Sequence, residues 1–242
     1  MVYQGGKFYQ SKSIAPIINK CIKENSLENY YEPFCGGLNV LDKIQCANLY
    51  ANDIDKDLIA FYQFIHDGGA PLDDVSKEEY YEIKKGNDLI KRGNVKHMAS
   101  FGGKPWGGYG GIDKRYGKTH YLAAKNNFLK QIPIIKNTNF SAMDYKELNF
   151  ISNSFIYCDP PYKGTTKYDN KTFNYDEFYE WVEKISQENF VIISEYSMPE
   201  NFTSFLKIPV RGRLAANDNK SKISDNLYYC DGLFKNWYEG GI

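Results

Sequence analysis

The sequence lacks the features that mark disulfide-bonded, zinc-binding or membrane-spanning proteins. Its five cysteines are odd in number and form no Cys-x-x-Cys pair, and the chain of 242 residues contains only 3 histidines. These scarcities argue against a disulfide framework and a zinc site, and we expect no bound metal. Because there is neither a long apolar run nor an amino-terminal signal peptide, we expect a cytoplasmic protein with reduced cysteines and no membrane partner.

The formal net charge is zero, but the charges are distributed unevenly along the chain. Residues 84–136 contain twelve of the 30 basic residues and two of the 30 acidic residues. This segment therefore carries a net charge of +10 and the remainder of the chain −10. Clustered Lys and Arg side chains contact phosphates, so this segregation favours binding of a polyanion. The alternative is a lysine-rich surface that contacts only solvent.

A distinctive tetrapeptide, Asp159-Pro160-Pro161-Tyr162, follows a short apolar run at residues 154–158 that is typical of a buried strand. An Asp at the carboxyl end of such a strand points into the crevice where α/β sheets bind ligands. The prolines have no N–H and keep the chain extended, so the Asp159 carboxylate and the Pro160 carbonyl can act as two acceptors. With the Tyr162 ring beside them, they suit a planar amino-heterocycle. The alternative is a Pro-Pro turn in which Tyr162 only packs.

A second motif runs from Glu32 through Phe34 to Gly36-Gly37, and it predicts a strand, a tight glycine turn and then a helix with Val40, Leu41 and Ile44 on its apolar face. Glycines at such a turn let the backbone approach a nucleotide. The motif lacks G-x-G-x-x-G and the Walker lysine, which excludes a dinucleotide fingerprint and a P-loop.

A third motif, Asn52-Asp53-Ile54-Asp55, ends the strand expected at residues 47–51. Asp53 lies 21 residues after Glu32, close to the ~20-residue spacing at which an acid reaches the ribose of a bound nucleoside. A carboxylate suits a vicinal diol because it accepts both O–H groups. Asp55 is an alternative ribose ligand, or Asp53 caps the helix expected at residues 57–66.

Together these motifs resemble the Dam-like D12 class of DNA adenine-N6 methyltransferases, which use S-adenosyl-L-methionine as the methyl donor. Gly5-Gly6-Lys7, before an amphipathic helix expected at residues 14–22 with Ser13 as its cap, resembles the amino-terminal motif of that family. The resemblance implies an α/β fold: a Rossmann-like class I methyltransferase sheet, a terminal antiparallel hairpin and a mainly helical inserted target-recognition domain. The hairpin is expected from residues 207–214 and 226–234, after a helix at 175–186 and a strand at 189–194.

The resemblance also implies roles for individual residues. Leu38 stands where many relatives have a small residue, and Phe34 fits the core as well as the cofactor site. Asp144 matches its motif only as an Asp-aromatic pair after a short strand. The implied catalytic residues are Asp159, Pro160 and Tyr162. The implied cofactor-binding residues are Tyr3, Lys7, Phe34, Gly36, Asp53, Asp144 and Asp159.

The resemblance further implies a catalytic domain at residues 1–66 and 138–242, with a DNA target-recognition domain inserted at residues 67–137. Within the insertion, Ser76 and Glu79 form a capping box, residues 119–130 are expected to be helical, and residues 101–111 interleave aromatics with six glycines. The aromatics of this loop suit either DNA wedging or packing. The candidate DNA-binding residues are Arg92, Lys104, Trp106, Tyr109, Lys114, Arg115 and Lys118.

The predicted function is therefore site-specific methyl transfer from S-adenosyl-L-methionine to the N6 amine of an adenine flipped out of double-stranded DNA. We expect a monomer or weak dimer, with a restriction endonuclease as a candidate partner. Methylation of cytosine N4 or RNA adenine, and a catalytically silent DNA-binding protein on the same scaffold, are the alternatives.

Overall fold

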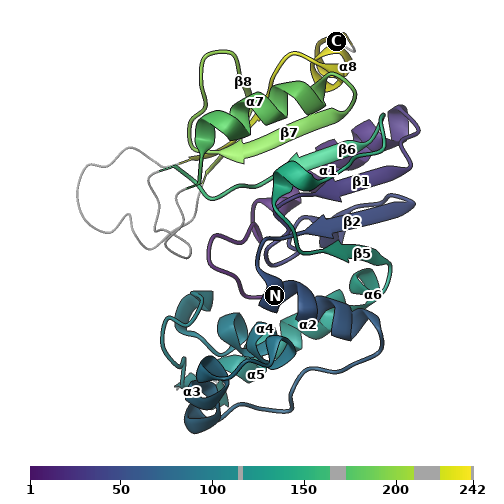
Figure 1. The fold of residues 1–242 in the computed structure, drawn as a ribbon. Helices are drawn as coiled ribbons and strands as arrows, with labels where there is room; N and C mark the ends of the chain where they lie inside the picture. Colours follow the sequence, from purple (N-terminus) through teal and green to yellow (C-terminus); the bar gives the residue numbers. More distant parts are fainter. Residues whose placement is uncertain (114–116, 164–172, 210–223, 241–242) are drawn as a thin grey trace, which may run out of the picture. The chain divides into compact units, whose positions relative to one another are not determined.

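The computed structural model describes residues 1–113, 117–163, 173–209 and 224–240. Candidate residues Lys114 and Arg115 lie outside this description. The larger sheet has seven strands in the order β5-β2-β1-β6-β7-β9-β8 (Figure 1). In chain order, these strands are β1 (Asn29–Glu32), β2 (Asn48–Asn52), β5 (Thr138–Ser141), β6 (Phe155–Cys158), β7 (Phe190–Glu195), β8 (Thr203–Pro209) and β9 (Ser224–Tyr229).

The sheet is parallel except at one end. β2 pairs with β5, and β6 pairs with both β1 and β7, all in parallel. β9 is antiparallel to both β7 and β8. Every residue of β6 and β7 is buried, as expected for central parallel strands covered on both faces. This confirms the predicted α/β sheet with an antiparallel terminal hairpin.

Tertiary contacts divide the chain into two compact units. Unit 1 comprises Met1–Phe8, Cys35–Ile44 and Asn48–Tyr145, whereas unit 2 comprises Tyr9–Phe34, Gln45–Ala47 and Lys146–Ile242. Unit 1 therefore contains residues 67–137 together with β2 and β5. The assignment of residues 67–137 as a separate recognition domain stays a prediction.

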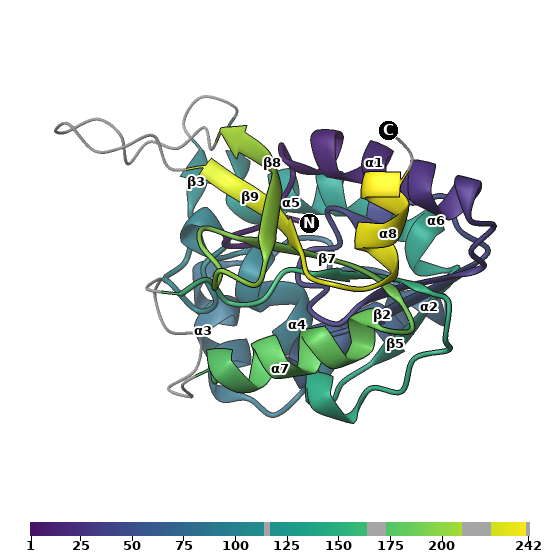
Figure 2. The same ribbon diagram turned by 90° about the horizontal axis from the view of Figure 1, so that it is seen from above.

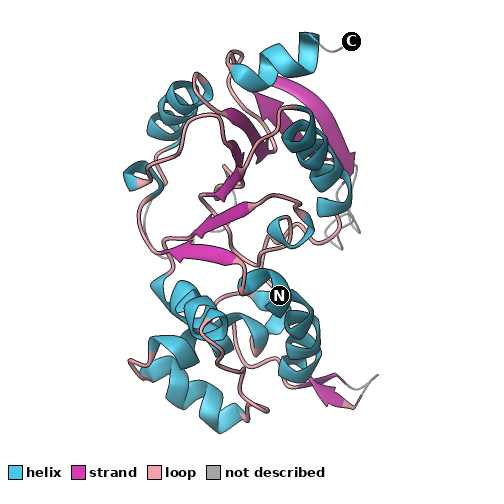
Figure 3. Cartoon of the chain, turned by 90° about the vertical axis from the view of Figure 1, so that its right-hand side faces the viewer, coloured by secondary structure: helices cyan, strands magenta, loops and turns pink. Residues whose placement is uncertain are grey.

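Unit 1 is mainly helical outside its two sheet strands (Figure 3). α2 packs against α4, α6 and β5, and the rings of Phe61 and Tyr62 on α2 stack on Phe128 with centroids 5.0 and 6.3 Å away. Two antiparallel strands of two residues each, β3 and β4, follow the glycine-rich loop. The elements are α2 (Lys56–His66), α3 (Lys77–Lys85), α4 (Leu89–Met98), β3 (Ile112–Asp113), β4 (Lys118–Thr119), α5 (His120–Phe128) and α6 (Ile132–Ile135).

Helices α2, α3, α4 and α5 of unit 1 begin at polar residues whose side chains accept otherwise unpaired N–H groups. The predicted capping box is confirmed: the Ser76 hydroxyl accepts from Glu79 N at 3.2 Å, and the Glu79 carboxylate accepts from Ser76 N at 2.8 Å. The Asp55 side chain caps α2 by accepting from Leu58 N, and the Asp88 side chain caps α4 by accepting from Lys91 N. The cap of α2 is thus Asp55, not Asp53.

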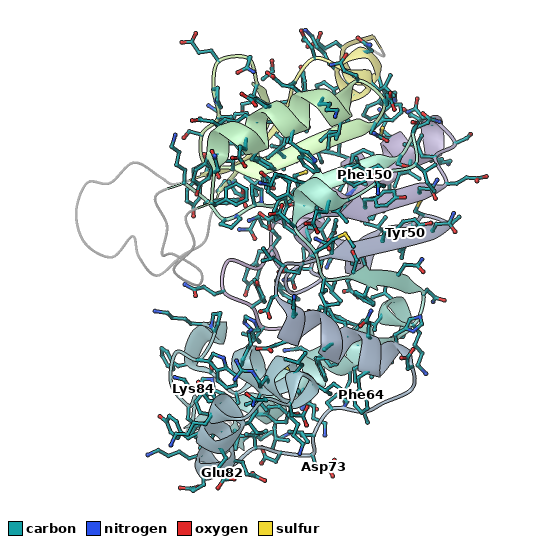
Figure 4. The ribbon with its side chains drawn as sticks, in the orientation of Figure 1. Tyr50, Phe64, Asp73, Glu82, Lys84 and Phe150 are labelled. Atoms are coloured by element: carbon teal, nitrogen blue, oxygen red, sulfur yellow. The ribbon has the colours of Figure 1, made fainter. Side chains whose placement is uncertain are left out.

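Unit 2 packs helices on both faces of its strands. α7 (Tyr175–Ser186) lies on one face, and α1 (Ser11–Glu24) and α8 (Leu233–Gly240) lie on the other (Figure 2). On the α7 side, Phe150 contacts Trp181 with ring centroids 5.8 Å apart (Figure 4). α1 and α8 are joined by a 3.0 Å hydrogen bond from Trp237 Nε1 to the Glu24 carboxylate. Among the described helices, none has both the length and the hydropathy needed to cross a membrane.

Three local expectations are wrong. The helix expected after the glycine turn is only a 3-10 turn, η1 (Leu41–Lys43), because the chain is already extended at Ile44 and β2 begins four residues later. Helix α1 begins at Ser11, so Ser13 lies inside it. The last predicted strand stops at Tyr229, and α8 then begins at Leu233, because this amphipathic segment buries Phe234 against Phe155.

The contact between α2 and α4 depends on Gly93. A Cβ placed there would lie 1.9 Å from the Asp57 carbonyl oxygen. Helix propensity alone predicts that Gly93→Ala stabilises the protein by up to about 1 kcal/mol. We expect destabilisation by about 1–3 kcal/mol instead, because the helices must separate.

Urea denaturation measures this difference. Gly86→Ala is the matched control, because its Cβ would lie 3.5 Å from the nearest atom, an ordinary contact distance. Unfolding free energies of Gly93→Ala equal to or above those of the wild type would contradict the close approach.

Candidate functional site

The backbone N–H groups of the glycine turn of unit 1 are hydrogen-bonded to residues at the end of β2. Cys35 N donates to the Asn52 carbonyl at 2.8 Å, and Gly36 N donates to Asp53 Oδ2 at 3.0 Å. The hydroxyl of Tyr62 donates to the Gly36 carbonyl at 2.7 Å. Gly36 has a φ of 42°, in the left-handed region that favours glycine. The structure therefore brings the predicted turn residue Gly36 and the predicted ribose ligand Asp53 into direct contact.

Asp53 is half-buried, and each of its carboxylate oxygens accepts one backbone N–H. Oδ1 accepts from Asp55 N at 3.0 Å, and Oδ2 accepts from Gly36 N. Burial raises the pKa of this carboxyl group, and the two backbone N–H groups oppose that rise. A carboxylate oxygen has two lone-pair sites, so both oxygens can accept a further hydroxyl group. Two acceptor oxygens side by side match the two hydroxyl donors of a vicinal diol.

Asp55, the alternative ribose ligand, is committed to other partners. Its carboxylate caps α2 and accepts from Lys96 Nζ at 2.7 Å, while His97 Nε2 lies 3.8 Å away. Burial alone would raise the pKa of Asp55, but His97 and Lys96 outweigh it and lower the pKa to about 2. These contacts favour Asp53 over Asp55 for a ligand.

The amino-terminal segment lies against the glycine turn. The Tyr3 ring stacks on His97 with centroids 4.5 Å apart, and a Cβ on Gly36 would lie 3.0 Å from Tyr3 Cε1. Gln4 N donates to the Gly103 carbonyl at 3.2 Å. Lys7 is 6% exposed, unusually buried for a lysine. The structure thus brings Tyr3 next to Gly36, as the predicted cofactor site requires.

Asn52 is a residue that the sequence analysis missed. Its side chain is buried, and its amide accepts from Met143 N at 3.1 Å and donates to the Met143 carbonyl at 3.0 Å. It also accepts from the Ser141 hydroxyl at 2.8 Å. The amide therefore fixes the loop that carries the half-buried Asp144 to the end of β2. An amide directly before Asp53 at a strand end was the available signal.

The acceptor motif of unit 2 directly follows β6, as predicted. Asp159 is half-buried and Pro160 is buried. The hydroxyl of Tyr175 donates to the Pro161 carbonyl at 3.0 Å, and Lys163 N donates to Glu195 Oε2 at 3.3 Å. The loop is therefore anchored on both sides of Tyr162.

Tyr162 is held by two residues that were not predicted as site residues. Its hydroxyl donates to Asp225 Oδ1 at 2.5 Å, and its ring meets Tyr196 edge-on, with centroids 4.5 Å apart. Burial raises the pKa of Tyr162 well above its usual value, and the charges of Asp159 and Asp225 add to the rise. A sequence signal existed only for Tyr196, which follows the predicted strand end.

Phe34 lies in an aromatic cluster of unit 2. Its ring meets Phe173 and Phe178 edge-on, with centroids 6.0 and 5.8 Å away. This packing is the core role that the sequence left open for Phe34. Its assignment to the cofactor site stays a prediction.

Arg92 is engaged within unit 1. Its Nε donates to Asp57 at 3.1 Å, its guanidinium donates to the carbonyls of Lys84 and Gly86, and it lies 5.3 Å from the Trp106 ring centroid. These contacts give the Arg92 side chain a packing role whatever else it binds.

The candidate residues of the glycine-rich loop, and Lys118 of β4, differ in how far they are exposed. Trp106 packs edge-on against Tyr80, and the Tyr109 hydroxyl donates to the Val75 carbonyl at 2.8 Å. Lys104 and Lys118 are exposed. Of the described candidates, these two lysines are therefore the best placed to reach a phosphate.

Ion pairs neutralise part of the basic segment. Lys96 bonds both Asp55 and Asp57, and Lys125 lies 3.3 Å from Asp73. The Asp73 side chain projects from the ribbon into solvent (Figure 4). No group of three His, Cys, Asp or Glu side chains in the described parts of the chain could hold a metal ion.

The sheet order, the glycine turn with Asp53, and the anchored acceptor motif after β6 are consistent with a methyltransferase fold. Residues 3–98 match the family model of the D12 class N6 adenine-specific DNA methyltransferases. The chain is also 26% identical, over 216 residues, to the Type II methyltransferase M.MjaIII of Methanocaldococcus jannaschii, an alignment that covers 72% of this chain and 74% of that protein. These similarities support an adenine-specific DNA methyltransferase.

The ion cluster around Asp55 predicts a pH dependence of stability. The folded pKa of about 2 lies below the usual value of 3.8, so the ionised Asp55 stabilises the fold above about pH 4 and loses that effect as the pH falls toward 2. The shift corresponds to about 2 kcal/mol for this mostly buried group.

Urea denaturation of wild type and Asp55→Asn tests this. We expect the difference in unfolding free energy to shrink by about 1 kcal/mol from about pH 6 to about pH 3. A difference that is constant or grows over this range would show that the charge of Asp55 does not stabilise the fold.

Proposed function

We propose that this DNA adenine methyltransferase acts on an adenine rotated out of duplex DNA, and that Asp159, Pro160 and Tyr162 bind the rotated base. The observation that carries the proposal is the anchored Tyr162 ring, two residues after the adjacent acceptors Asp159 and Pro160 at the end of β6. A base inside a duplex cannot enter such a site, so rotation out of the stack precedes the reaction.

Asp159 and Pro160 activate the amine. The exocyclic nitrogen of adenine is a poor nucleophile because its lone pair is delocalised into the ring. The Asp159 carboxylate and the Pro160 carbonyl each accept one N–H, which turns the lone pair out of conjugation. Positive charge then develops on nitrogen beside the carboxylate, where it is stabilised electrostatically. S-adenosyl-L-methionine would supply the methyl group and leave as its neutral thioether, and the methylated nitrogen then loses one proton to solvent.

The residues of unit 1 fit this cofactor chemically. The Asp53 carboxylate accepts the ribose hydroxyls, and Gly36 leaves the backbone of the turn close to the nucleoside. Asp144, on the loop fixed by Asn52, accepts from the adenine amine. Tyr3 and Lys7 bind the methionine portion. Asp159 and Phe34, which belong to unit 2, are the remaining predicted cofactor-binding residues.

Residues 67–137 form the proposed DNA recognition domain. The exposed side chains of Lys104 and Lys118, together with Lys114 and Arg115, make the phosphate contacts. Trp106 and Tyr109 shape the loop between them. A restriction endonuclease partner stays a prediction, with which the Type II designation of the relative is consistent. A monomer or weak dimer is also a prediction.

Loss of the Asp159 carboxylate tests the proposed chemistry. We expect Asp159→Ala to lower kcat for methyl transfer to DNA by about 10²-fold or more, because the developing charge loses its stabilising partner. Transfer of labelled methyl groups from S-adenosyl-L-methionine to plasmid DNA measures this. The exposed Asp176→Ala of α7 is the control. Near-normal turnover of Asp159→Ala would rule the proposed role out.

The phosphate contacts are tested by salt dependence. We expect replacement of Lys104 and Lys118 by alanine to flatten the plot of log DNA affinity against log salt by about 0.9 for each lysine that binds a phosphate. S-adenosyl-L-methionine affinity should not change. Lys125→Ala, which removes a charge already paired with Asp73, should flatten the slope less. Equal slopes for the double variant and the wild type would exclude these two lysines from the DNA interface.

A further inference from the structure

The Tyr162 side chain is held at its hydroxyl by a carboxylate from a strand far along the chain. Asp225, the second residue of β9, is 1% exposed and accepts from the Tyr162 hydroxyl at 2.5 Å. This is the short end of the range for an O–H donor and an ionised acceptor, and such bonds are about twice as strong as neutral ones. The tyrosine is only half-buried. Its hydroxyl is thus fixed although its ring is partly open.

A buried carboxylate is a costly hydrogen-bond partner. A neutral amide or hydroxyl acceptor would leave no charge in the interior, whereas a buried carboxylate must be compensated by hydrogen bonds. With Asp225, the hydroxyl has a stronger hydrogen bond than a neutral acceptor would give, at a higher desolvation cost. Packing of Tyr162 alone does not require that choice.

Two further contacts define the plane of the Tyr162 ring. Tyr196 meets it edge-on, at an interplanar angle of 85°. Glu195, also 1% exposed, accepts from the backbone N–H groups of Lys163 and Tyr196 at 3.3 and 2.7 Å. The backbone N–H groups of the residue after Tyr162 and of Tyr196 are therefore bonded to the same carboxylate. With the hydroxyl bound to Asp225, the ring has little freedom to rotate.

We propose that Asp225 is a positioning residue for methyl transfer. Its hydrogen bond to the Tyr162 hydroxyl sets the plane of the ring on which the target adenine stacks, before the base arrives. This inference rests on the proposed role of Tyr162 in base binding. A side chain that is already ordered loses less freedom on binding, so the bond contributes to productive placement of the base.

A double-mutant cycle tests this coupling with Asp225→Asn, Tyr162→Phe and the double variant. The measurements are kcat and KM for plasmid DNA with labelled S-adenosyl-L-methionine, and the Kd of that cofactor by calorimetry. We expect each single variant to lower kcat/KM for DNA by about tenfold, the typical effect of losing a hydrogen bond to a charged group. The double variant should show about the same tenfold reduction, because both substitutions remove the same hydrogen bond. Cofactor affinity should stay within about twofold of wild type, which general unfolding would not allow.

Asp231→Asn is the matched control, because Asp231 is exposed and pairs with Lys235 on the surface. It should keep wild-type kinetics. A double variant with about a hundredfold reduction would show that Asp225 and Tyr162 act independently, and would overturn the inference. Wild-type activity of a folded Asp225→Asn would do the same.

If Asp225→Asn does not fold by circular dichroism, Tyr162→Phe decides, since it removes the same bond and keeps the ring. Wild-type kinetics of Tyr162→Phe would overturn the inference, and about a tenfold reduction in kcat/KM with unchanged cofactor affinity would support it. If the wild type itself placed no methyl group on DNA adenine, the proposed function would fail as well, which distinguishes that failure from absence of the coupling alone.

Discussion

Carboxylates at strand ends must be bonded to N–H or O–H groups wherever they leave water, and the loops described in each unit depend on this requirement. In unit 1, Asp53 accepts from the backbone of the glycine turn and of Asp55, so the acid that suits the ribose also fixes the turn. In unit 2, Glu195 accepts from Lys163 N and Asp225 from the Tyr162 hydroxyl. The acids therefore hold these loops in shape.

The same requirement changes the interpretation of the basic segment. Lys96 and Arg92 come from a stretch with a net charge of +10, yet they bond the acids Asp55 and Asp57 at the start of α2. A net charge computed along the sequence therefore overstates the charge that this segment offers to DNA. Exposed lysines such as Lys104 and Lys118 are better candidates for phosphate contacts than the arginine that the sequence favoured equally.

Most of the fold could be predicted because its signals are local. Helix α7 lies at the predicted residues 175–186, since its apolar spacing and its cap are contained within the segment. The helix expected after Gly37 failed because the nearby start of β2 limits it, which is a tertiary constraint. Likewise, Tyr162 could be selected from its motif, but its partner Asp225 is 63 residues away, and pairing at that distance is set by the strand order alone. The ion pair of Arg92 with Asp57 was hidden because it depends on the packing of α4 against α2.

The central claim is that two acceptors after β6 direct a methyl group to the exocyclic amine of adenine in DNA. Nucleoside mass spectrometry of random-sequence duplex DNA, after reaction with S-adenosyl-L-methionine labelled in its methyl group, tests it most directly. The account predicts that the label appears in N6-methyladenine, at a subset of adenines that share a flanking sequence. Label in N4-methylcytosine, or no transfer to DNA by a folded protein that binds the cofactor, would contradict it.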